Sequence, residues 1–434
     1  MKKVRLFLIV CFLSINFLNA QSLYFPPLTG STWNTTDPQS LNWCQARIDS
    51  LYNYLQVKNT KSFILLKDGK IVLEKYFGTY TVDSLHYWAS ASKSLASFIT
   101  GIAQQKGLIN INNQVSQYIG NHWTSAPLAK ENLITVKNLL EMTSGLDDAP
   151  PLPCGTEDTA KACLIYKADA GTRWAYHTGA YKKVQDVVST MAGVNYNLVT
   201  NNWIETQTGM SGTWFQQVYY SKARDMARFG LLNLNKGIWN TDTIMRDSVY
   251  FKEMTNTSQN FNLSYGYLWW LNGKPTYMNP GIQVVLNGPL IPNCPTDMYA
   301  ALGKADQKIY VVPSTGMVVV RQGSSAENVT FALSTFDNNL WDYINKLNCN
   351  VTSIKIQDEN HPKISIYPNP ANDVITVKSE VGLKSVVLTN SIGQTFDIEF
   401  INSEINISQL KKGLYFLTIT SVENTSLVKK IVVN

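Results

Sequence analysis

The chain has 434 residues, about three times the ~150 residues of a typical domain, so the sequence predicts at least two folding units. Hydrophobic residues make up 44% and charged residues 16%, which excludes a disordered chain and a membrane-embedded bundle. Lys and Arg total 37 against 31 Asp and Glu, but three of these cations lie in the first five residues, which leaves 37 − 3 = 34. Without long basic runs, this balance argues against a nucleic-acid partner. The four histidines form no HExxH motif, which argues against a histidine-based metal site.

The first twenty residues predict a signal peptide. Lys2, Lys3 and Arg5 form a positive region, residues 6–13 are apolar, and cleavage after Ala20 fits the small-residue rule. The alternative is an uncleaved anchor, but the apolar run is shorter than the ~20 residues that a membrane span needs. We therefore expect an exported mature chain without a transmembrane segment, either soluble or attached to a surface.

Export makes disulfide bonds possible. Cys11 leaves with the signal peptide, and five cysteines remain, an odd number that leaves one thiol over. Cys154 and Cys163 flank a short polar loop and are the easiest pair to close. Cys44 and Cys349 lie in helix-like segments near the two ends of the first domain and are the second candidate pair. Cys294 is left unassigned.

The hydrophobic patterning of the sequence changes near residue 350. Residues 21–350 mix helical and strand patterns, residues 351–363 form a polar linker, and residues 364–434 show short alternating strands separated by turns. The strands are expected at 374–378, 385–389, 396–401, 414–418 and 427–433. This pattern predicts a small all-β sandwich as a C-terminal domain.

The C-terminal segment carries a specific combination of sequence motifs. It contains IYPNPA at 366–371, SIGQ at 391–394, LKKGLY at 410–415 and KKIV at 429–432. Together these phrases resemble the C-terminal sorting domain of the type IX secretion system of Bacteroidota. The resemblance implies type IX machinery as a partner, export through the periplasm, and a location on the cell surface or outside the cell. The alternative is a carbohydrate-binding or adhesive module.

In the first domain, the strongest chemical signal lies at the start of a predicted helix that ends near Gly107. Ser90 and Lys93 are spaced i, i+3 and share a helix face. The helix N-terminus offers free N–H groups to a developing oxyanion. A serine hydroxyl needs a nearby base to act as a nucleophile, and Lys93 can serve if its pKa is lowered. The alternative is an ordinary serine-capped helix with a solvated lysine.

Four sequence motifs further along the chain favour a catalytic Ser90–Lys93 pair over an ordinary capped helix. GTRWAYHTGAY at 171–181 places Tyr176 in a loop before a helix, and DMYAALGKADQKIYVVP at 297–313 predicts a strand hairpin that continues through 317–321. LLEMTSGL at 139–146 and ARDMARFG at 223–230 stand at suitable intervals. With the SxxK motif, they resemble the serine β-lactamase and penicillin-binding-protein superfamily, and within it the class C β-lactamase-related esterases, amidases and 6-aminohexanoate-dimer hydrolases. The resemblance covers residues 58–350.

The resemblance implies an α/β (α+β) fold with a central antiparallel sheet, helices on both sides and an all-helical lobe. It also implies that Ser90 is the acylated nucleophile, Lys93 its base, and Tyr176 the proton shuttle of a Tyr-x-Asn element. This chain departs from that element, because Thr178 replaces the asparagine. His177 is a candidate for tuning the tyrosine, although such a histidine is more often a wall residue.

The Lys-Thr-Gly strand element of true β-lactamases is also missing. A Gly-x-x-x-Gln variant, from Gly303 to Gln307, stands in its place and brings Lys304 and Ala305 to the pocket. The backbone N–H of Ser90 and one from Lys304 or Ala305 would hold the oxyanion. These departures leave acyl transfer intact but put penicillin recognition in doubt.

The sequence therefore predicts an exported serine hydrolase that cleaves an ester or amide bond of a small molecule or short peptide. The scheme requires no metal and no organic cofactor. The alternatives are a D-alanyl peptidase, a β-lactamase, or a catalytically inactive relative that binds or senses peptidoglycan. A further apolar segment, residues 265–270, alternates large side chains and predicts a strand of the core, with outward partners available to a pocket.

Overall fold

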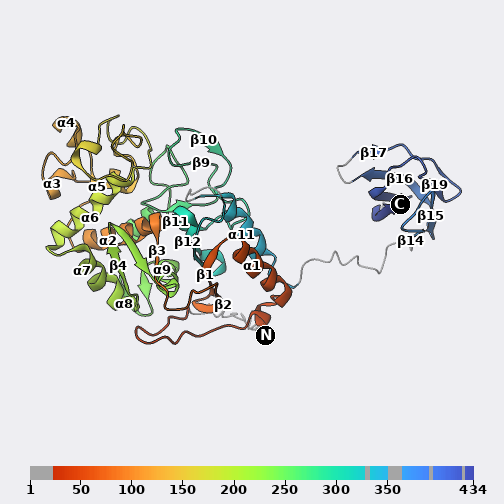
Figure 1. Cartoon of the computed structure of the whole chain (residues 1–434), viewed down its shortest axis with the longest axis horizontal. Coiled ribbons are helices and arrows are strands. Elements are labelled where there is room, and N and C mark those ends of the chain that lie inside the picture. Colours follow the sequence, from red (N-terminus) through yellow and green to blue (C-terminus); the bar gives the residue numbers. More distant parts are fainter. Residues whose placement is uncertain (1–22, 328–332, 350–363, 391–393, 423–425) are drawn as a thin grey trace, which may run out of the picture. The chain divides into compact units, whose positions relative to one another are not determined.

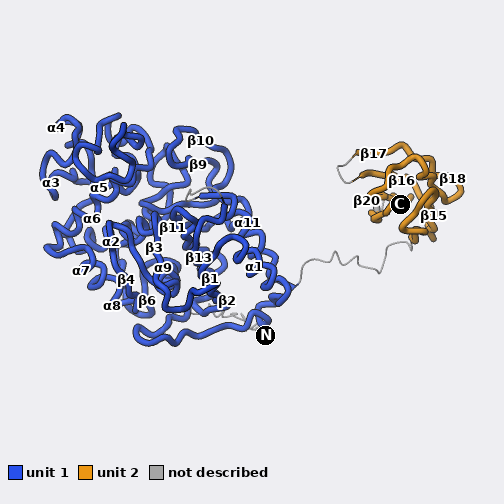
Figure 2. The backbone as a smooth tube through the Cα atoms, viewed as in Figure 1, with its two compact units in different colours: residues 1–349 blue, residues 350–434 orange. Residues whose placement is uncertain are grey.

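The computed structural model describes residues 23–327, 333–349, 364–390, 394–422 and 426–434. The chain divides into two compact units, residues 1–349 and residues 350–434 (Figures 1 and 2). The predicted signal peptide, residues 1–20, and the predicted linker, residues 351–363, lie outside the described residues. Within the described part of the chain, no helix is both long and apolar enough to cross a membrane.

A six-stranded antiparallel sheet forms the centre of the first unit. Its strands follow the order β2-β1-β13-β12-β11-β8, so the first hairpin of the chain pairs with the last strands of the domain. The predicted hairpin at 297–313 is present, and its continuation forms the next strand. The strands are β1 (Thr60–Lys67), β2 (Lys70–Tyr76), β8 (Trp270–Leu271), β11 (Tyr299–Gly303), β12 (Gln307–Val312) and β13 (Met317–Gly323).

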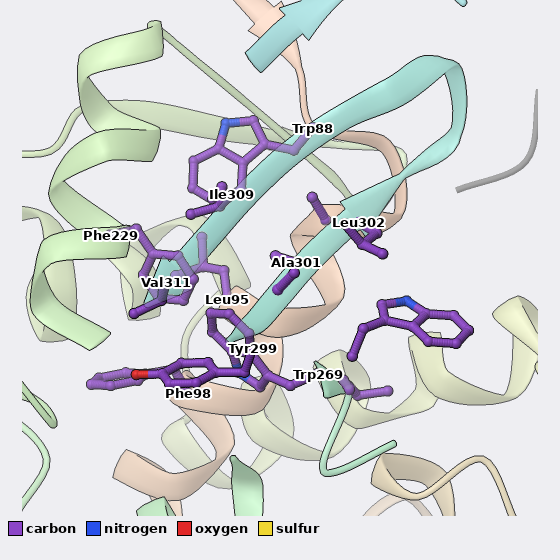
Figure 3. Close-up of a cluster of buried hydrophobic side chains, with 14 of the residues drawn as sticks. Trp88, Leu95, Phe98, Phe229, Trp269, Tyr299, Ala301, Leu302, Ile309 and Val311 are labelled. Carbon is purple, nitrogen blue, oxygen red and sulfur yellow. The ribbon is translucent and has the colours of Figure 1, made fainter. Parts of the chain in front are cut away.

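Helices cover both faces of this sheet, which confirms the predicted fold class (Figure 1). Along β12, Ile309 and Val311 pack among the apolar side chains of α2 (Ser92–Gln105) and α9 (Ala223–Leu234), as Figure 3 shows. Tyr310 points to the opposite face and meets Trp341 of α11 (Thr335–Asn345), with ring centroids 5.7 Å apart. This two-residue alternation is the ordinary consequence of strand geometry. Because both faces are covered, the middle of the strands carries consecutive apolar residues, as at residues 63–66 of β1 and 317–320 of β13.

The remaining elements of the first unit surround this core. A lobe of short helices separates α2 from the later strands and includes a π-helical turn at Asn201–Glu205. The helices are α1 (Gln45–Val57), α3 (Ser116–Ile119), α4 (Leu128–Glu131), α5 (Val136–Leu140), α6 (Thr178–Ala192), α7 (Tyr196–Thr200), α8 (Thr206–Thr208) and α10 (Ser248–Met254). Two small ribbons pair β6 (Ile238–Trp239) with β7 (Asp242–Thr243), and β9 (Thr276–Met278) with β10 (Val285–Asn287).

A three-stranded sheet stands beside the start of α2. Its order is β3-β5-β4, with β3 at His86–Tyr87, β4 at Gly212–Phe215 and β5 at Val218–Ser221. The Trp88 N–H donates to the Tyr219 carbonyl over 2.8 Å, and the Tyr219 N–H donates to the Ser92 hydroxyl over 2.9 Å. These bonds fasten the small sheet to the segment that carries Ser90.

The expected strand at residues 265–270 is wrong. The chain instead makes a tight reversal, in which Tyr265 and Trp270 form an isolated antiparallel bridge and Leu268 has a φ of 59°. The Ser94 hydroxyl donates to the Leu268 carbonyl over 2.7 Å, so the reversal docks on α2. A Cβ atom at Gly266 would lie 2.2 Å from the Met254 carbonyl oxygen, which prevents any larger residue there. The expected burial in the core is confirmed, because Tyr265 and Trp270 are 1% and 2% exposed.

Both predicted disulfide pairings are present. Cys44, at the N-cap of α1, is bonded to Cys349, and Cys154 is bonded to Cys163. Cys44 and Cys349 lie just outside helices rather than within them. The Cys294 thiol is free and buried, and burial raises its pKa.

The second unit is the predicted β-sandwich. Its two four-stranded sheets enclose an apolar core that includes Ile375, Leu417 and Ile431. The expected strand at 396–401 is wrong, because the chain crosses there between the sheets and forms two short strands, β17 and β18. One sheet contains β14 (Ile364–Tyr367), β15 (Val374–Ser379), β19 (Glu404–Asn406) and β18 (Phe400–Ile401); the other contains β17 (Thr395–Phe396), β16 (Leu383–Asn390), β20 (Gly413–Ser421) and β21 (Ser426–Val433).

Candidate active site

Ser90 lies in a single 3₁₀ turn, Ala89–Ala91, that leads directly into α2. The preceding residue, Ala89, has a φ of 50°, which is uncommon for a residue with a side chain. Such strained backbone persists only where the surroundings impose it, and it is concentrated at functional sites. Here the surroundings are the buried Trp88 and the small sheet to which it is hydrogen-bonded. The fold therefore presents the Ser90 hydroxyl in one fixed position.

Lys93 lies one turn further along and contacts Ser90. Its Nζ atom is 2.8 Å from the Ser90 Oγ atom, and the side chain is buried. Burial lowers the pKa of Lys93 to about 7; Glu157 opposes this shift, while Lys182 and Lys304 add to it. Since half of such a lysine is neutral near pH 7, it can accept a proton from the serine.

Tyr176 comes to the same place from a distant part of the sequence. Its ring centroid is 4.9 Å from the Lys93 Nζ atom, and the rise that burial causes in the pKa of Tyr176 is partly offset by the Ser90 side chain. The ring stacks on Trp270 at 6.0 Å and meets Tyr265 edge-on at 6.2 Å. Burial raises the pKa of Tyr176, so the hydroxyl stays protonated at neutral pH and is a hydrogen-bond donor. The fold thus brings the three predicted catalytic residues together.

Thr178 and His177 lie at the start of α6 and differ in their relation to the site. Thr178 lines the cavity beside Ser90, where the resemblance places an asparagine. His177 is buried, and its Nδ1 atom accepts a hydrogen bond from the Ala180 N–H over 3.2 Å, which caps the helix. Burial lowers the pKa of His177 to about 4, so the ring is neutral at pH 7. Any tuning of Tyr176 by His177 therefore acts without a positive charge.

The predicted strand element forms a tight turn against the turn that carries Ser90. A Cβ atom at Gly303 would lie 2.4 Å from the Trp88 carbonyl oxygen, so only glycine allows the strand to come this close. The next residues, Lys304–Asp306, make a 3₁₀ turn in which Ala305 has a φ of 56°. The Gln307 Nε2 atom donates to the Ala305 carbonyl over 2.8 Å and to the Gly323 carbonyl over 2.7 Å. The buried Gln307 amide therefore holds the turn to the central sheet.

A cavity of about 370 Å³ opens over Ser90. Its walls combine charged and aromatic side chains from the helical lobe, the strand turn and the small sheet. The charged residues are Lys93, Glu157, Lys182 and Lys304, and the aromatic residues are Tyr87, Tyr181, Phe215 and Tyr220.

Part of the cavity wall is the disulfide-closed loop between Cys154 and Cys163. This loop packs tightly on the start of α6, because a Cβ atom at Gly179 would lie 1.9 Å from the Asp158 carbonyl oxygen. Glu157 extends from the loop to Lys304, with 3.3 Å between the carboxylate and Nζ atoms. The Lys182 Nζ atom donates to the Glu157 carbonyl over 3.1 Å. An exposed ion pair of this kind is worth roughly 0–1 kcal/mol, so an incoming ligand can displace it.

Comparison with known families identifies the domain. Residues 60–333, more than half of the chain, match the family described as beta-lactamase. The chain belongs to the β-lactamase family. Residues 365–434 match the family of secretion-system C-terminal sorting domains, which confirms the second resemblance as well. A curated relative, an uncharacterised protein of Alkalihalophilus pseudofirmus, is 20% identical over 306 residues, which cover 61% of this chain and 83% of the relative.

Solved structures of β-lactamase-family proteins share the fold. A Bacillus anthracis protein provisionally assigned as a 6-aminohexanoate-dimer hydrolase has a TM-score of 0.56 and 20% identity, covering 74% of this chain and 88% of its own. A mutant class C β-lactamase with tyrosine changed to phenylalanine has a TM-score of 0.52 and 15% identity, covering 69% and 96%. A family VIII carboxylesterase has a TM-score of 0.52 and 13% identity, covering 70% and 98%. At these identities the likeness establishes the fold alone.

The β-lactamase-family site contains residues that sequence reasoning missed. Tyr181 lies beneath Lys93, with its ring centroid 4.6 Å from the Nζ atom, and Phe215 and Tyr220 line the cavity. Tyr181 is the last residue of the motif at 171–181 and lies one helical turn after His177, and this position in the motif could have predicted its place near the site. Phe215 and Tyr220 belong to a hairpin that no motif connects to the site. Within the described ranges, no group of three or more His, Cys, Asp or Glu side chains is arranged to hold a metal ion.

Proposed function

We propose that this protein is an exported serine hydrolase that cleaves an ester or amide bond through an acyl-enzyme on Ser90. The observation that carries the proposal is the contact of Ser90 Oγ with Lys93 Nζ at 2.8 Å, with the Tyr176 ring centroid 4.9 Å from the same Nζ atom. A nucleophile, a base with a near-neutral pKa and a protonated tyrosine are what acyl transfer requires. Membership of a hydrolase family supports the same reaction class.

The proposed reaction has two steps. In the first, Ser90 Oγ attacks the substrate carbonyl carbon while neutral Lys93 takes the hydroxyl proton. The tetrahedral oxyanion is stabilised by the backbone N–H groups of Ser90 and Ala305, a contribution of several kcal/mol in comparable sites. Tyr176 passes a proton to the leaving alcohol or amine, and the bond to it breaks. In the second step, water attacks the carbonyl carbon of the acyl-enzyme, and Lys93 and Tyr176 take its proton. The bond to Ser90 Oγ then breaks, the same pair returns a proton to Oγ, and the carboxylic acid leaves.

The substrate class is proposed as simple esters or amides rather than penicillins. The chain lacks the asparagine and the Lys-Thr-Gly strand that normally help to hold penicillins, and it has Thr178 and Lys304–Asp306 at those positions. Proteins of similar fold include a carboxylesterase and a provisionally assigned amide hydrolase, as well as a class C β-lactamase. The fold is therefore compatible with all three activities, and the residues of the site favour the first two.

Labelling with a fluorophosphonate probe tests the nucleophile. We expect covalent labelling of the wild type and none of Ser90→Ala. Ser92→Ala is the matched control, because Ser92 lies only two residues further along but its hydroxyl oxygen accepts a hydrogen bond from the Tyr219 N–H of the small sheet. Labelling of Ser90→Ala at the wild-type rate would place the nucleophile elsewhere, and a wild type that never labels would favour a binding or sensing relative.

A substrate panel tests the bond that is cleaved. Short p-nitrophenyl esters and anilides are compared with D-alanyl dipeptides and with a chromogenic cephalosporin. We expect turnover of the esters or anilides and none of the lactam. Rapid lactam or dipeptide cleavage with inert esters would replace the esterase or amidase assignment by a β-lactamase or D-alanyl peptidase.

We also propose that the tail directs the enzyme through the type IX pathway, by way of the periplasm, to the cell surface or the medium. The match to a secretion-system sorting domain supports export. The second unit has its own hydrophobic core, which is consistent with a sorting signal that folds independently of the catalytic domain.

A further inference from the structure

One wall of the Ser90 cavity is aromatic and has no part in the proposed chemistry. Tyr87, Phe215 and Tyr220, all from sheet β3-β5-β4, line the cavity. Tyr87 and Tyr220 are cross-strand partners with ring centroids 6.2 Å apart, and the Phe215 ring lies 6.4 Å from the Tyr220 ring. These three rings, named here the aromatic wall, form a continuous apolar surface that begins beside Ser90.

The alternation of the strands explains why these rings face the cavity. Trp214 and Tyr219 point into the core and are 7% and 0% exposed. Their neighbours Phe215 and Tyr220 must therefore point to the other face. Phe215 is 60% exposed, although it is a large aromatic residue beside a concave site. Ligand pockets characteristically combine such apolar surface with a few polar groups.

The hairpin that carries the wall is held rigidly. Its two-residue turn, Gln216 and Gln217, has φ values of 49° and 63°, a conformation that favours Gly or Asn. The turn is held instead by α6, because the Gln217 carbonyl accepts hydrogen bonds from the Gln185 amide at 3.2 Å and the Tyr181 hydroxyl at 3.4 Å. These contacts hold the backbone of the turn that follows Phe215, and a backbone positioned before a ligand arrives reduces the entropy lost on binding.

Most of the other residues that line the cavity are polar or charged. Lys304 and Glu157 form an ion pair that lines it, and Lys182 adds a further charge. We infer that the aromatic wall binds a ring-bearing or planar group of the substrate, so that the hydrolase selects aromatic esters or amides. This inference rests on the proposed function, because it takes Ser90 as the point at which the bond is cleaved.

Three esters test the inference: ethyl acetate, ethyl phenylacetate and benzyl acetate, all followed by pH-stat titration. They place a ring on neither side, on the acyl side or on the alcohol side of the bond, with leaving alcohols of similar acidity. We expect wild-type kcat/KM to be higher for at least one ring-bearing ester than for ethyl acetate. Phe215→Ala should lower kcat/KM for that ester by roughly two- to tenfold, the range for losing one aromatic contact. Ethyl acetate turnover should change by less than that.

Matched variants separate the wall from general effects. Thr213→Ala changes a residue on the same strand and the same face as Phe215, but outside the cavity lining, and should leave the ring preference intact. Tyr220→Leu and Tyr87→Leu should each weaken the preference, and they decide the matter if Phe215→Ala does not fold. A wild type without ring preference, or variants that lower all three esters equally, would overturn the inference. Fluorophosphonate labelling of each protein reports on Ser90 separately, so a wild type that labels but shows no ring preference contradicts only the aromatic wall and not the proposed function.

Discussion

Lys93 is buried, and among the described ion pairs no carboxylate contacts it. Its Nζ atom has instead the Ser90 hydroxyl at 2.8 Å and the faces of Tyr176 and Tyr181. Aromatic faces attract a cation, but they do not replace the hydration that burial removes. The net result is that the pKa of Lys93 is lowered to about 7, so that a large fraction of the side chain is neutral at neutral pH and can accept a proton.

The first prediction concerns the proton relay. Lys93→Ala and Tyr176→Phe should each lower turnover by on the order of a hundredfold or more, because each removes a positioned proton-transfer group. The double variant should lose far less than the product of the two effects, since both residues serve one relay. Steady-state kinetics of the four proteins on one ester provide the measurement. Multiplicative losses would show that Lys93 and Tyr176 act in separate steps.

The second prediction concerns pH. If Lys93 is the base as proposed, its neutral form is the active one, and kcat/KM should rise as pH rises through about 7 and then level off. Glu157 raises and Lys182 lowers the pKa of Lys93. Glu157→Gln should therefore move the rising limb to lower pH, and Lys182→Gln should move it to higher pH.

Both Glu157 and Lys182 reach solvent, so the two shifts should shrink at 1 M salt, where the screening length is ~3 Å. The pH–rate profiles of the three proteins at low and high salt are the measurement. Identical limbs in wild type and variants at low salt would mean that a group other than Lys93 titrates in this range.

At the scale of elements, the site depends on how the turn after β11 is supported. Gln307 bonds to the Ala305 carbonyl from one side, and the Arg321 guanidinium donates to the same carbonyl over 3.2 Å. The Gln307 Oε1 atom also accepts from the Gly323 N–H over 3.0 Å. The Ala305 carbonyl is thus held by side chains from two central strands. The Gln307 Nε2 atom also lies 3.5 Å from the Lys304 carbonyl oxygen, which belongs to the peptide unit that carries the Ala305 N–H group.

The third prediction is that Gln307 acts through this turn. Gln307→Ala leaves buried backbone groups unpaired, which should lower the free energy of unfolding by roughly 1–3 kcal/mol. It should also lower kcat by about tenfold or more with little change in KM, because the proposed oxyanion donor, the Ala305 N–H, would be used mainly in the transition state. Denaturant titration and ester kinetics measure the two effects. A less stable variant with wild-type kcat would make Gln307 a purely structural residue.

The elements that the sequence predicted well are those specified locally. The helix that begins near Ser90 and the hairpin from β11 to β12 carry their periodicity in consecutive residues. Short motifs placed Lys93 and Lys304 at the cavity and Tyr176 beside Lys93. The segment Tyr265–Trp270 was predicted as a strand because its large residues alternate, but it forms a reversal. The contact that requires the reversal, between Gly266 and the Met254 carbonyl, is made with helix α10, which the alternation pattern does not include. Phe215 was missed for the same reason. Its cavity is made by chain segments that meet only after folding.

At the scale of the whole molecule, the two units have separate hydrophobic cores. The core of the first unit surrounds Ser90, and the core of the second is built from its own strands. Every residue that lines the Ser90 cavity belongs to the first unit. The division predicts that catalysis and sorting can be separated by truncation.

The fourth prediction is that deleting residues 364–434 leaves turnover and substrate range of the purified enzyme unchanged. In a native Bacteroidota host, the same deletion should leave the enzyme inside the outer membrane, because the address has been removed. Assay of the pure protein and fractionation of cells measure the two halves. A folded but inactive truncated enzyme would make the tail part of the substrate site, and a truncated enzyme that still reached the medium would refute the sorting role.

The bond between Cys44 and Cys349 encloses the entire catalytic fold within one covalent ring. Cys349 is also where the first unit gives way to the segment leading to the tail. A protein tethered by its tail and pulled by flow or by a partner would transmit that tension through Cys349 into Cys44. Tension applied between the tail and Cys44 would therefore pass across the sulfur–sulfur link and bypass the chain from residue 45 to residue 348, which contains the strands and helices that hold Ser90.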